Sequence, residues 1–366
     1  MVRFIQSVGL QSFTPPSKLA AAIVLMLCAT IGRAQPRVTW AVEGNTEVGW
    51  NMSDGRAVWV NLLSAGIDVG LWKGAHLEGE AISTYTTNKN VSDNLLGFSN
   101  IYTPTNKAFR LIQASLGQSF GQWAYVSVGL RNIDTDYFTS PSTSLFTAPA
   151  DADFPTLSNN YPLATYPMAA LGIHIEAYPV NGLTVKASIY NGAADESLKR
   201  QFRVRPGHDG YFSIGSVTYE RENRSENPAS YTIGYIAGRA PGDGDDEGLV
   251  GKSGLWLLVE QPFMYVGTTQ WCLLMQGSVM TRYTKNTHGY WGTGLTVNGI
   301  GKRNIQAGVA VNRMHDRTGN ELDAEATCLV PLNDWLSVQP AMHFIRSHSR
   351  EIVVGMLRFS VAFGNK

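Results

Sequence analysis

Charged residues and long apolar runs are both scarce in this chain of 366 residues. Only 16% of the residues are charged, and 29 basic residues balance 29 acidic ones, so the composition indicates neither a nucleic-acid partner nor an acidic membrane surface. After residue 35 no apolar run approaches the ~18 residues of a membrane helix, and no long 3.6-residue periodicity occurs. Such a chain can enter a membrane only as a closed barrel, because only closure satisfies every strand edge in lipid.

Cysteine is rare too, with three residues in the chain. Cys28 lies in an apolar N-terminal run that we expect to be removed. Alternation puts Cys272 on the same face of its segment as Gln276, whereas Cys328 shares a face with Ala326, so the two should point to opposite sides of a sheet. We predict free thiols, even in a compartment that permits disulfides. The seven histidines show no ligand spacing with the cysteines, so we predict neither a metal site nor a cofactor.

Residues 1–34 have the pattern of a cleaved export signal. Lys18 precedes an apolar run over 19–29, and the small residue Ala34 suits cleavage after it. We therefore expect residues 35–366 to form the mature protein, after export through the inner membrane.

Apolar and polar residues alternate with a period of two in segments of about ten to fourteen residues, each followed by a turn. Twelve clear segments and four plausible ones predict an all-β chain with about sixteen strands, at 38–52, 57–71, 75–87, 109–120, 123–131, 171–177, 183–190, 210–221, 230–239, 254–263, 269–283, 290–297, 305–311, 322–330, 336–345 and 351–363.

The predicted connections differ in length according to their order along the chain. Even-numbered connections, such as 72–74 and 179–182, are short, while several odd-numbered ones, such as 88–108 and 132–166, are long. This pattern is typical of a single transmembrane antiparallel β-barrel of a bacterial outer membrane, with short periplasmic turns and longer extracellular loops.

Glycine and aromatic residues are abundant, with 37 glycines, 9 Trp, 15 Tyr and 14 Phe. Trp72, Trp123, Tyr178 and Trp335 all fall at predicted short turns, which favours one interfacial girdle. The alternative is that each is an ordinary core aromatic.

The face opposite each apolar stripe is polar. Glu78 and Glu80 share one face of their strand, and Glu176 shares a face with a histidine. Unpaired burial of such charges costs several kcal/mol each, so this face should be hydrated. In the last strand, 351–363, the same alternation directs the apolar residues to lipid and Arg358 to a water-filled lumen.

Four segments, 129–138, 166–192, 254–262 and 335–345, resemble in consistent order the carbohydrate-selective porins of Gram-negative outer membranes. The resemblance implies a sixteen-stranded channel for the passive diffusion of small sugars such as glucose, surrounded by outer-membrane lipid and lipopolysaccharide. The last strand is similar to the terminal signal that barrel-assembly machinery reads, although three residues follow its final aromatic, Phe363.

The resemblance also implies that the loop 132–166 folds into the lumen and narrows it. Acidic and basic groups at such a constriction create a transverse field and hydrogen-bond partners for polyhydroxylated solutes, and flat aromatics suit sugar rings. The candidate residues of the constriction are Arg131, Asp134, Asp136, Tyr137, Phe138 and Trp256. Further candidates on the lumen wall, each of which can also be read as a solvated wall residue, are Glu78, Glu80, Arg110, Glu176 and Glu260.

Three other functions stay open from the sequence. A general diffusion porin for small solutes would show the same alternation. The segment 117–121 matches the G-x-S-x-G pattern of serine hydrolases, with Ser119 as nucleophile, but that motif requires a helix after it and a strand is predicted there. A secreted carbohydrate-binding β-protein is the third possibility.

Overall fold

The computed structural model describes residues 37–87, 91–92, 96–195, 197–221, 227–242, 248–282, 287–316, 319–347 and 350–365. The predicted export signal, 1–34, lies outside the described residues.

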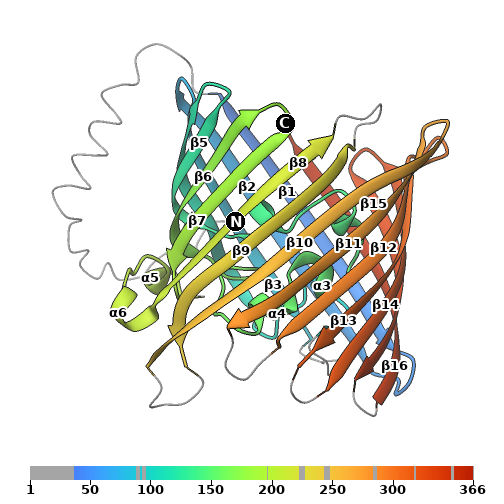
Figure 1. Cartoon of the computed structure of the whole chain (residues 1–366). Coiled ribbons are helices and arrows are strands. Elements are labelled where there is room, and N and C mark those ends of the chain that lie inside the picture. The colour runs from blue at the N-terminus through green and yellow to red at the C-terminus, as the bar shows by residue number, and fades with distance from the viewer. Residues whose placement is uncertain are drawn as a thin grey trace, which may run out of the picture.

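Sixteen antiparallel strands form one closed barrel, in which each strand pairs with its neighbour in sequence and β1 pairs with β16 (Figure 1). This confirms the predicted fold class. The strands are β1 (Val38–Asn51), β2 (Ala57–Trp72), β3 (Ala75–Thr86), β4 (Lys107–Phe120), β5 (Ala124–Arg131), β6 (Ala170–Val180), β7 (Leu183–Asn191), β8 (Tyr211–Arg221), β9 (Ala229–Pro241), β10 (Leu249–Val266), β11 (Thr269–Arg282), β12 (Gly289–Ile300), β13 (Ile305–His315), β14 (Asn320–Asn333), β15 (Leu336–Ser347) and β16 (Arg350–Gly364).

The helices are single turns in the connections. They are α2 (Asp134–Tyr137), the 3-10 turn η1 (Thr143–Leu145), α3 (Pro149–Ala152), α4 (Pro155–Ser158), α5 (Leu198–Gln201) and α6 (Pro206–Asp209). Within the part of the chain that the structure describes, none has the length and apolar character to cross a membrane.

The outer face of the barrel is apolar, and each of the sixteen strands carries at least one exposed large apolar side chain. On β16, Leu357, Phe359 and Phe363 are exposed while Arg358 is 8% exposed, as alternation predicts. An apolar exterior with a polar interior is what a barrel in lipid requires.

The aromatics at the short turns lie on the outside as well. Trp72, Trp123, Tyr178 and Trp335 are all exposed, which excludes the alternative that they are core residues. Trp335 stacks on Phe363, with ring centroids 5.9 Å apart, next to the end of β16.

Both cysteines in the strands are free, as predicted. Cys272 is buried on the inner face of β11, whereas Cys328 lies next to the inward Thr327 on β14 and is partly exposed. Opposite faces of the barrel wall keep the two thiols apart.

Some strands are longer than alternation predicts. β10 begins at Leu249 instead of Gly254, because its pairing with β9 continues to the pair of Leu249 and Pro241. On β4, a register shift near Leu111 interrupts the alternation, and Arg110 is buried while Phe109 is exposed. The sequence left the direction of Arg110 open, and the structure places it on the inner side.

The first and last strands close the barrel through a buried ion pair. Glu47 of β1 is in register with Arg358 of β16, and the two side chains form an ion pair. The connection between β3 and β4 folds over this pair: Arg358 donates to the side chain of Asn100 at 2.6 Å, and the hydroxyl of Ser99 donates to Glu47. Strands more than 300 residues apart in the sequence are joined here.

Candidate functional site

The connection between β5 and β6, residues 132–169, lies inside the barrel, where α3 and α4 are seen through the wall in Figure 1. Its polar groups bond to the inner faces of strands from β7 to β15. Tyr137 bonds to Ser188 on β7 at 2.7 Å, and the carbonyl of Leu145 accepts from Gln339 on β15 at 2.6 Å. We call residues 132–169 the inward segment. It runs three residues beyond the predicted loop 132–166.

Aromatic side chains hold the inward segment against the wall. Phe138 lies edge-on to Trp256 of β10 with ring centroids 5.6 Å apart and to Phe154 at 5.2 Å, and Phe154 lies 5.8 Å from Tyr290 of β12. Phe138 and Trp256 are each only 2% exposed. Edge-to-face contacts of this kind stabilise a packed cluster beyond simple burial.

Carboxylates of the wall anchor the segment's backbone. Glu325 of β14 accepts the N–H of Thr147 at 2.9 Å and that of Ala148 at 3.0 Å. Glu260 of β10 accepts the N–H of Ser142 at 2.6 Å and the hydroxyl of Ser140 at 2.9 Å. Hydrogen bonds to a charged acceptor are stronger than neutral ones, so these residues fix the path of the segment.

A network of charges lies at the start of the inward segment, next to the end of β5. Arg131, the last residue of β5, donates to Asp136 of α2 at 2.8 Å and to Glu78 of β3 at 3.3 Å. It also bonds to the hydroxyl of Ser127 at 2.6 Å, and Tyr125 donates to the other oxygen of Glu78 at 2.9 Å. The guanidinium thereby joins α2 to the barrel wall.

The network continues along β6 and β7. His174 lies 2.9 Å from Glu176 through Nε2, and Lys186 lies 3.4 Å from the same carboxylate. Lys186 also donates to the backbone carbonyl of Asp136 at 2.8 Å. Fixed charges of both signs therefore alternate around this part of the interior.

The Asp134 side chain bonds to a different part of the chain than its sequence neighbours Arg131 and Asp136 do. Its carboxylate accepts the N–H of Tyr166 at 2.7 Å, and nearby the N–H of Ile133 donates to the carbonyl of Ala164 at 2.8 Å. Burial raises the pKa of the Asp134 carboxyl to about 7, against the lowering effect of the Tyr166 bond. The structure brings Arg131 and Asp136 together as expected, but Asp134 joins the two ends of the inward segment.

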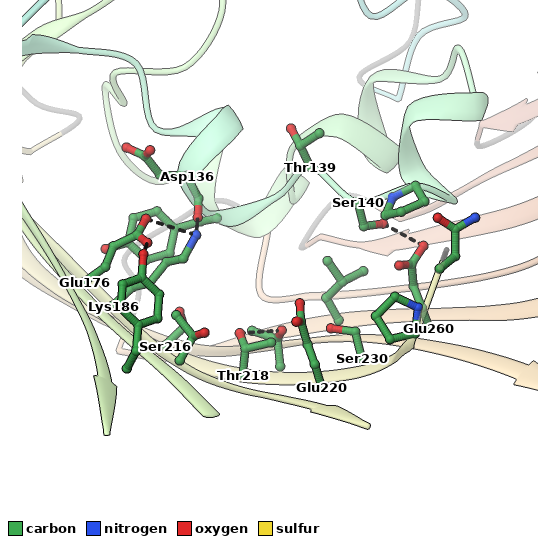
Figure 2. Close-up of a pocket in the computed structure, with 18 residues that line it drawn as sticks. Asp136, Thr139, Ser140, Glu176, Lys186, Ser216, Thr218, Glu220, Ser230 and Glu260 are labelled. Atoms are coloured by element: carbon green, nitrogen blue, oxygen red, sulfur yellow. Dashed lines mark hydrogen bonds and ion pairs between the residues drawn. The ribbon is translucent and has the colours of Figure 1, made fainter. Parts of the chain in front are cut away.

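A cavity of about 290 Å³ opens between the start of the inward segment and the wall from β6 to β10. Figure 2 shows Asp136, Thr139 and Ser140 on the side of the inward segment, opposite a row of strand residues. Hydroxyl and carboxylate groups dominate its lining, from Thr184, Ser216, Thr218, Ser230, Thr232, Glu176, Glu220 and Glu260, with Lys186 as the basic residue of the strands. A cavity lined in this way can exchange hydrogen bonds with a polyhydroxylated solute.

The remaining predicted residues lie in several places. Tyr137 lines this cavity with its hydroxyl bonded to Ser188, whereas Phe138 and Trp256 are covered by the aromatic cluster. Glu80 lines a second, smaller cavity of about 180 Å³ at β1 to β4. Arg110 donates to the carbonyl of Thr105 at 3.0 Å and belongs to neither cavity.

Sequence reasoning missed several residues of the first cavity. Lys186, Glu220 and the hydroxyl row were not singled out, although they occupy inward positions of β7 to β9. Alternation in "LTVKASIY" already places Thr184, Lys186 and Ser188 on one face, so the signal that finds them was present.

The hydrolase motif does not have the geometry of a nucleophile elbow. Ser119 is the second-last residue of β4 and pairs with Tyr125 of β5 across the turn at 121–123. An elbow requires the serine between a strand and a helix, and here two strands flank the turn.

Comparison with known proteins identifies similar sequences and folds. The family model described as "Carbohydrate-selective porin, OprB family" matches residues 69–363. The high-pH structure of Pseudomonas putida OprB aligns with a TM-score of 0.77 and 16% identity, covering 94% of this chain and 96% of that one. No curated protein sequence matches.

Other porins share the fold. An anion-selective porin from Comamonas acidovorans aligns with a TM-score of 0.60 and 12% identity, covering 90% of this chain and 100% of that one. Salmonella typhi OmpF, in complex with daunomycin, gives 0.61 and 9% identity, with coverages of 89% and 97%. At these identities the likeness shows the porin fold alone.

Proposed function

The chain belongs to the OprB family of carbohydrate-selective porins, and from this we propose that it lets small carbohydrates, monosaccharides such as glucose, diffuse passively through its lumen. The family and the barrel fold imply the outer membrane of a Gram-negative bacterium. Diffusion down a gradient needs no cofactor, so the selectivity must come from the residues along the path.

One observation carries this proposal: the inward segment places paired charges beside a hydroxyl-lined cavity. Arg131, Asp136 and Glu176 hold fixed charges of both signs next to the cavity's row of Ser and Thr residues. A sugar that sheds part of its water there finds replacement hydrogen bonds in several directions. Each contact stays weak and shared, so the solute can also leave.

In this proposal the inward segment is the constriction. Arg131, Asp136, Glu78 and Glu176 contribute the field along the path, and Tyr137 contributes an aromatic edge. Phe138 and Trp256 act indirectly, because their buried rings hold the segment in place instead of meeting the solute.

We also propose partners for the exterior. The exposed apolar side chains of the strands would contact outer-membrane lipid and lipopolysaccharide. The end of β16, with Phe363 exposed and stacked on Trp335, would be the part that barrel-assembly machinery reads after export through the inner membrane.

The test is liposome swelling with the refolded protein in glucose, a disaccharide and a neutral amino acid of similar size to glucose. We expect glucose to enter faster than the amino acid, and Arg131→Ala and Asp136→Ala to reduce that preference. Rates ordered by solute size alone would identify a general diffusion porin instead. Swelling no faster than in empty liposomes, together with no channel-like steps in a bilayer, would contradict a porin function altogether.

A further inference from the structure

The cavity in Figure 2 carries more acidic than basic groups once its ion pairs are matched. Asp136 is paired with Arg131 at 2.8 Å, and Glu176 with Lys186 at 3.4 Å. The other two carboxylates of the lining belong to Glu220 and Glu260, and neither forms an ion pair with a basic residue of the described chain. Among the described residues, two negative charges are therefore left without a matching cation.

These two carboxylates lie in one row across the wall. Glu220 of β8 is in register with Ser230 of β9, and Ser230 is in register with Glu260 of β10. Neighbours in register lie about 5 Å apart between their Cβ atoms, so roughly 10 Å separates the two glutamates. One small solute over Ser230 would be close to both.

Hydroxyl groups surround this row. Thr218 and Thr232, in register with each other one inward position further along, share a hydrogen bond of 2.8 Å, and Ser140 of the inward segment donates to Glu260 at 2.9 Å. One oxygen of Glu260, Oε1, accepts the bonds from the inward segment, and no hydrogen bond within the described chain engages its Oε2. The row thus offers hydroxyls for a sugar and a carboxylate oxygen for a cationic group.

We propose that this cavity favours polyhydroxylated solutes carrying a protonated amine, such as a hexosamine, over neutral sugars of the same size. The inference rests on the proposed function, because it refines which sugars pass most readily. An ammonium group between Glu220 and Glu260 gains charge-assisted hydrogen bonds that a hydroxyl cannot give. Glu220 is exposed to water, which keeps the attraction weak enough for release.

The experiment measures initial influx of radiolabelled glucosamine, N-acetylglucosamine and glucose, at tracer concentration, into proteoliposomes in 0.1 M KCl at pH 7. Glucosamine should enter roughly three- to ten-fold faster than glucose, and N-acetylglucosamine, which lacks the charge, should not. Raising KCl to 1 M should reduce the preference, because the Debye length falls to about 3 Å.

Two variants and a control locate the effect. Glu220→Gln, at an exposed position, and the double variant Glu220→Gln/Glu260→Gln should each lower the ratio of glucosamine to glucose influx, the double variant to near one. Glu351→Gln, an exposed carboxylate at the far end of β16, should leave the ratio unchanged. The inference is overturned if the ratio of glucosamine to glucose influx is one in the native protein, or if it is unchanged in both variants. If glucose still enters in that case, the proposed function stands. Influx of no sugar above empty vesicles overturns both.

Discussion

At the scale of single residues, Arg131 is the residue that holds the start of the inward segment against the barrel wall. It is only 6% exposed and pairs with both Asp136 and Glu78. Arg131→Ala leaves these carboxylates without their cation, so we expect a loss of about 3 kcal/mol in the free energy of unfolding and a larger single-channel conductance. Arg131→Lys keeps the charge but not the forked geometry, so its stability and its conductance should both lie between those of the native protein and those of Arg131→Ala. Urea unfolding and bilayer recordings measure both effects.

The control for Arg131 is Arg346→Ala, which removes an exposed arginine paired with Glu351 at 3.4 Å on the outer rim. Exposed ion pairs contribute little, so this variant should match the native protein within about 1 kcal/mol. Equal effects of the two substitutions would show that Arg131 has no special role in the constriction.

Asp134 predicts a pH dependence for the inward segment. Burial, with a smaller contribution from the charge of Asp136, raises its pKa from 3.8 to about 7, and burial together with Asp134 raises the pKa of the neighbouring Asp153. Between these values the closed segment binds a proton that the open segment releases, so local stability falls as pH rises from about 4 to 7. Hydrogen exchange of the Ile133 amide, corrected for its intrinsic rate, should show falling protection over this range.

Asp134→Asn supplies the control for that measurement. The amide oxygen can still accept the Tyr166 N–H, but the titrating carboxyl is gone, so the pH dependence should become flatter. A native profile that is already flat, or one that rises with pH, would contradict the assignment.

Alternation predicted whether a wall residue faces inward or outward, but it did not predict which residues that side chain contacts. Glu78 and Glu176 face inward as expected, because the period of two is a local property of a strand. Trp256 also faces inward, yet its covering by Phe138 and Phe154 depends on where a distant connection folds. No local pattern carries that information, and for the same reason the bond between Asp134 and the Tyr166 N–H could not be predicted.

At the scale of elements, the inward segment depends on the strand residues that accept its backbone N–H groups. Glu325→Ala removes the acceptor of Thr147 and Ala148 and leaves two buried donors unsatisfied, at about 1–3 kcal/mol each. We expect the middle of the segment to detach part of the time, which should appear in bilayer recordings as a higher mean conductance and added open-channel noise.

Cys328→Ala is the matched control, since Cys328 lies on the same strand but on the opposite face. It should leave conductance and noise unchanged. If Glu325→Ala behaves like this control, the aromatic cluster alone holds the segment. The strands themselves could be predicted from sequence, whereas these anchors could not, because they join residues 178 positions apart.

At the scale of the whole molecule, the number of strands and the alternation of short and long connections were enough to predict a closed barrel. Closure itself depends on contacts between the two ends of the chain, and Glu47 and Arg358, 311 residues apart, form the ion pair of that seam. Arg358 was expected to face a hydrated lumen. The structure instead shows it nearly covered, because Ser99 and Asn100 fold over it.

Removal of one partner should therefore destabilise the closed barrel. Glu47→Ala leaves the Arg358 guanidinium buried without its carboxylate, and we expect a loss of about 3–5 kcal/mol in the free energy of unfolding. The measurement is urea unfolding followed by gel electrophoresis of unheated samples. The midpoint is the urea concentration at which the folded band gives way to the unfolded one. A loss below about 1 kcal/mol would mean that water reaches the guanidinium and that the seam depends on its backbone pairing alone.

The double variant Glu47→Ala/Arg358→Met separates the ion pair from the packing around it. With both charges removed and the volume of the arginine largely kept, most of the lost stability should return, since no buried charge is left unpaired. Full recovery would mean that the pair contributes little beyond the register it imposes on β1 and β16. A double variant no more stable than Glu47→Ala would instead assign the loss to the hydrogen bond between Ser99 and Glu47, and thus to the connection that covers the seam.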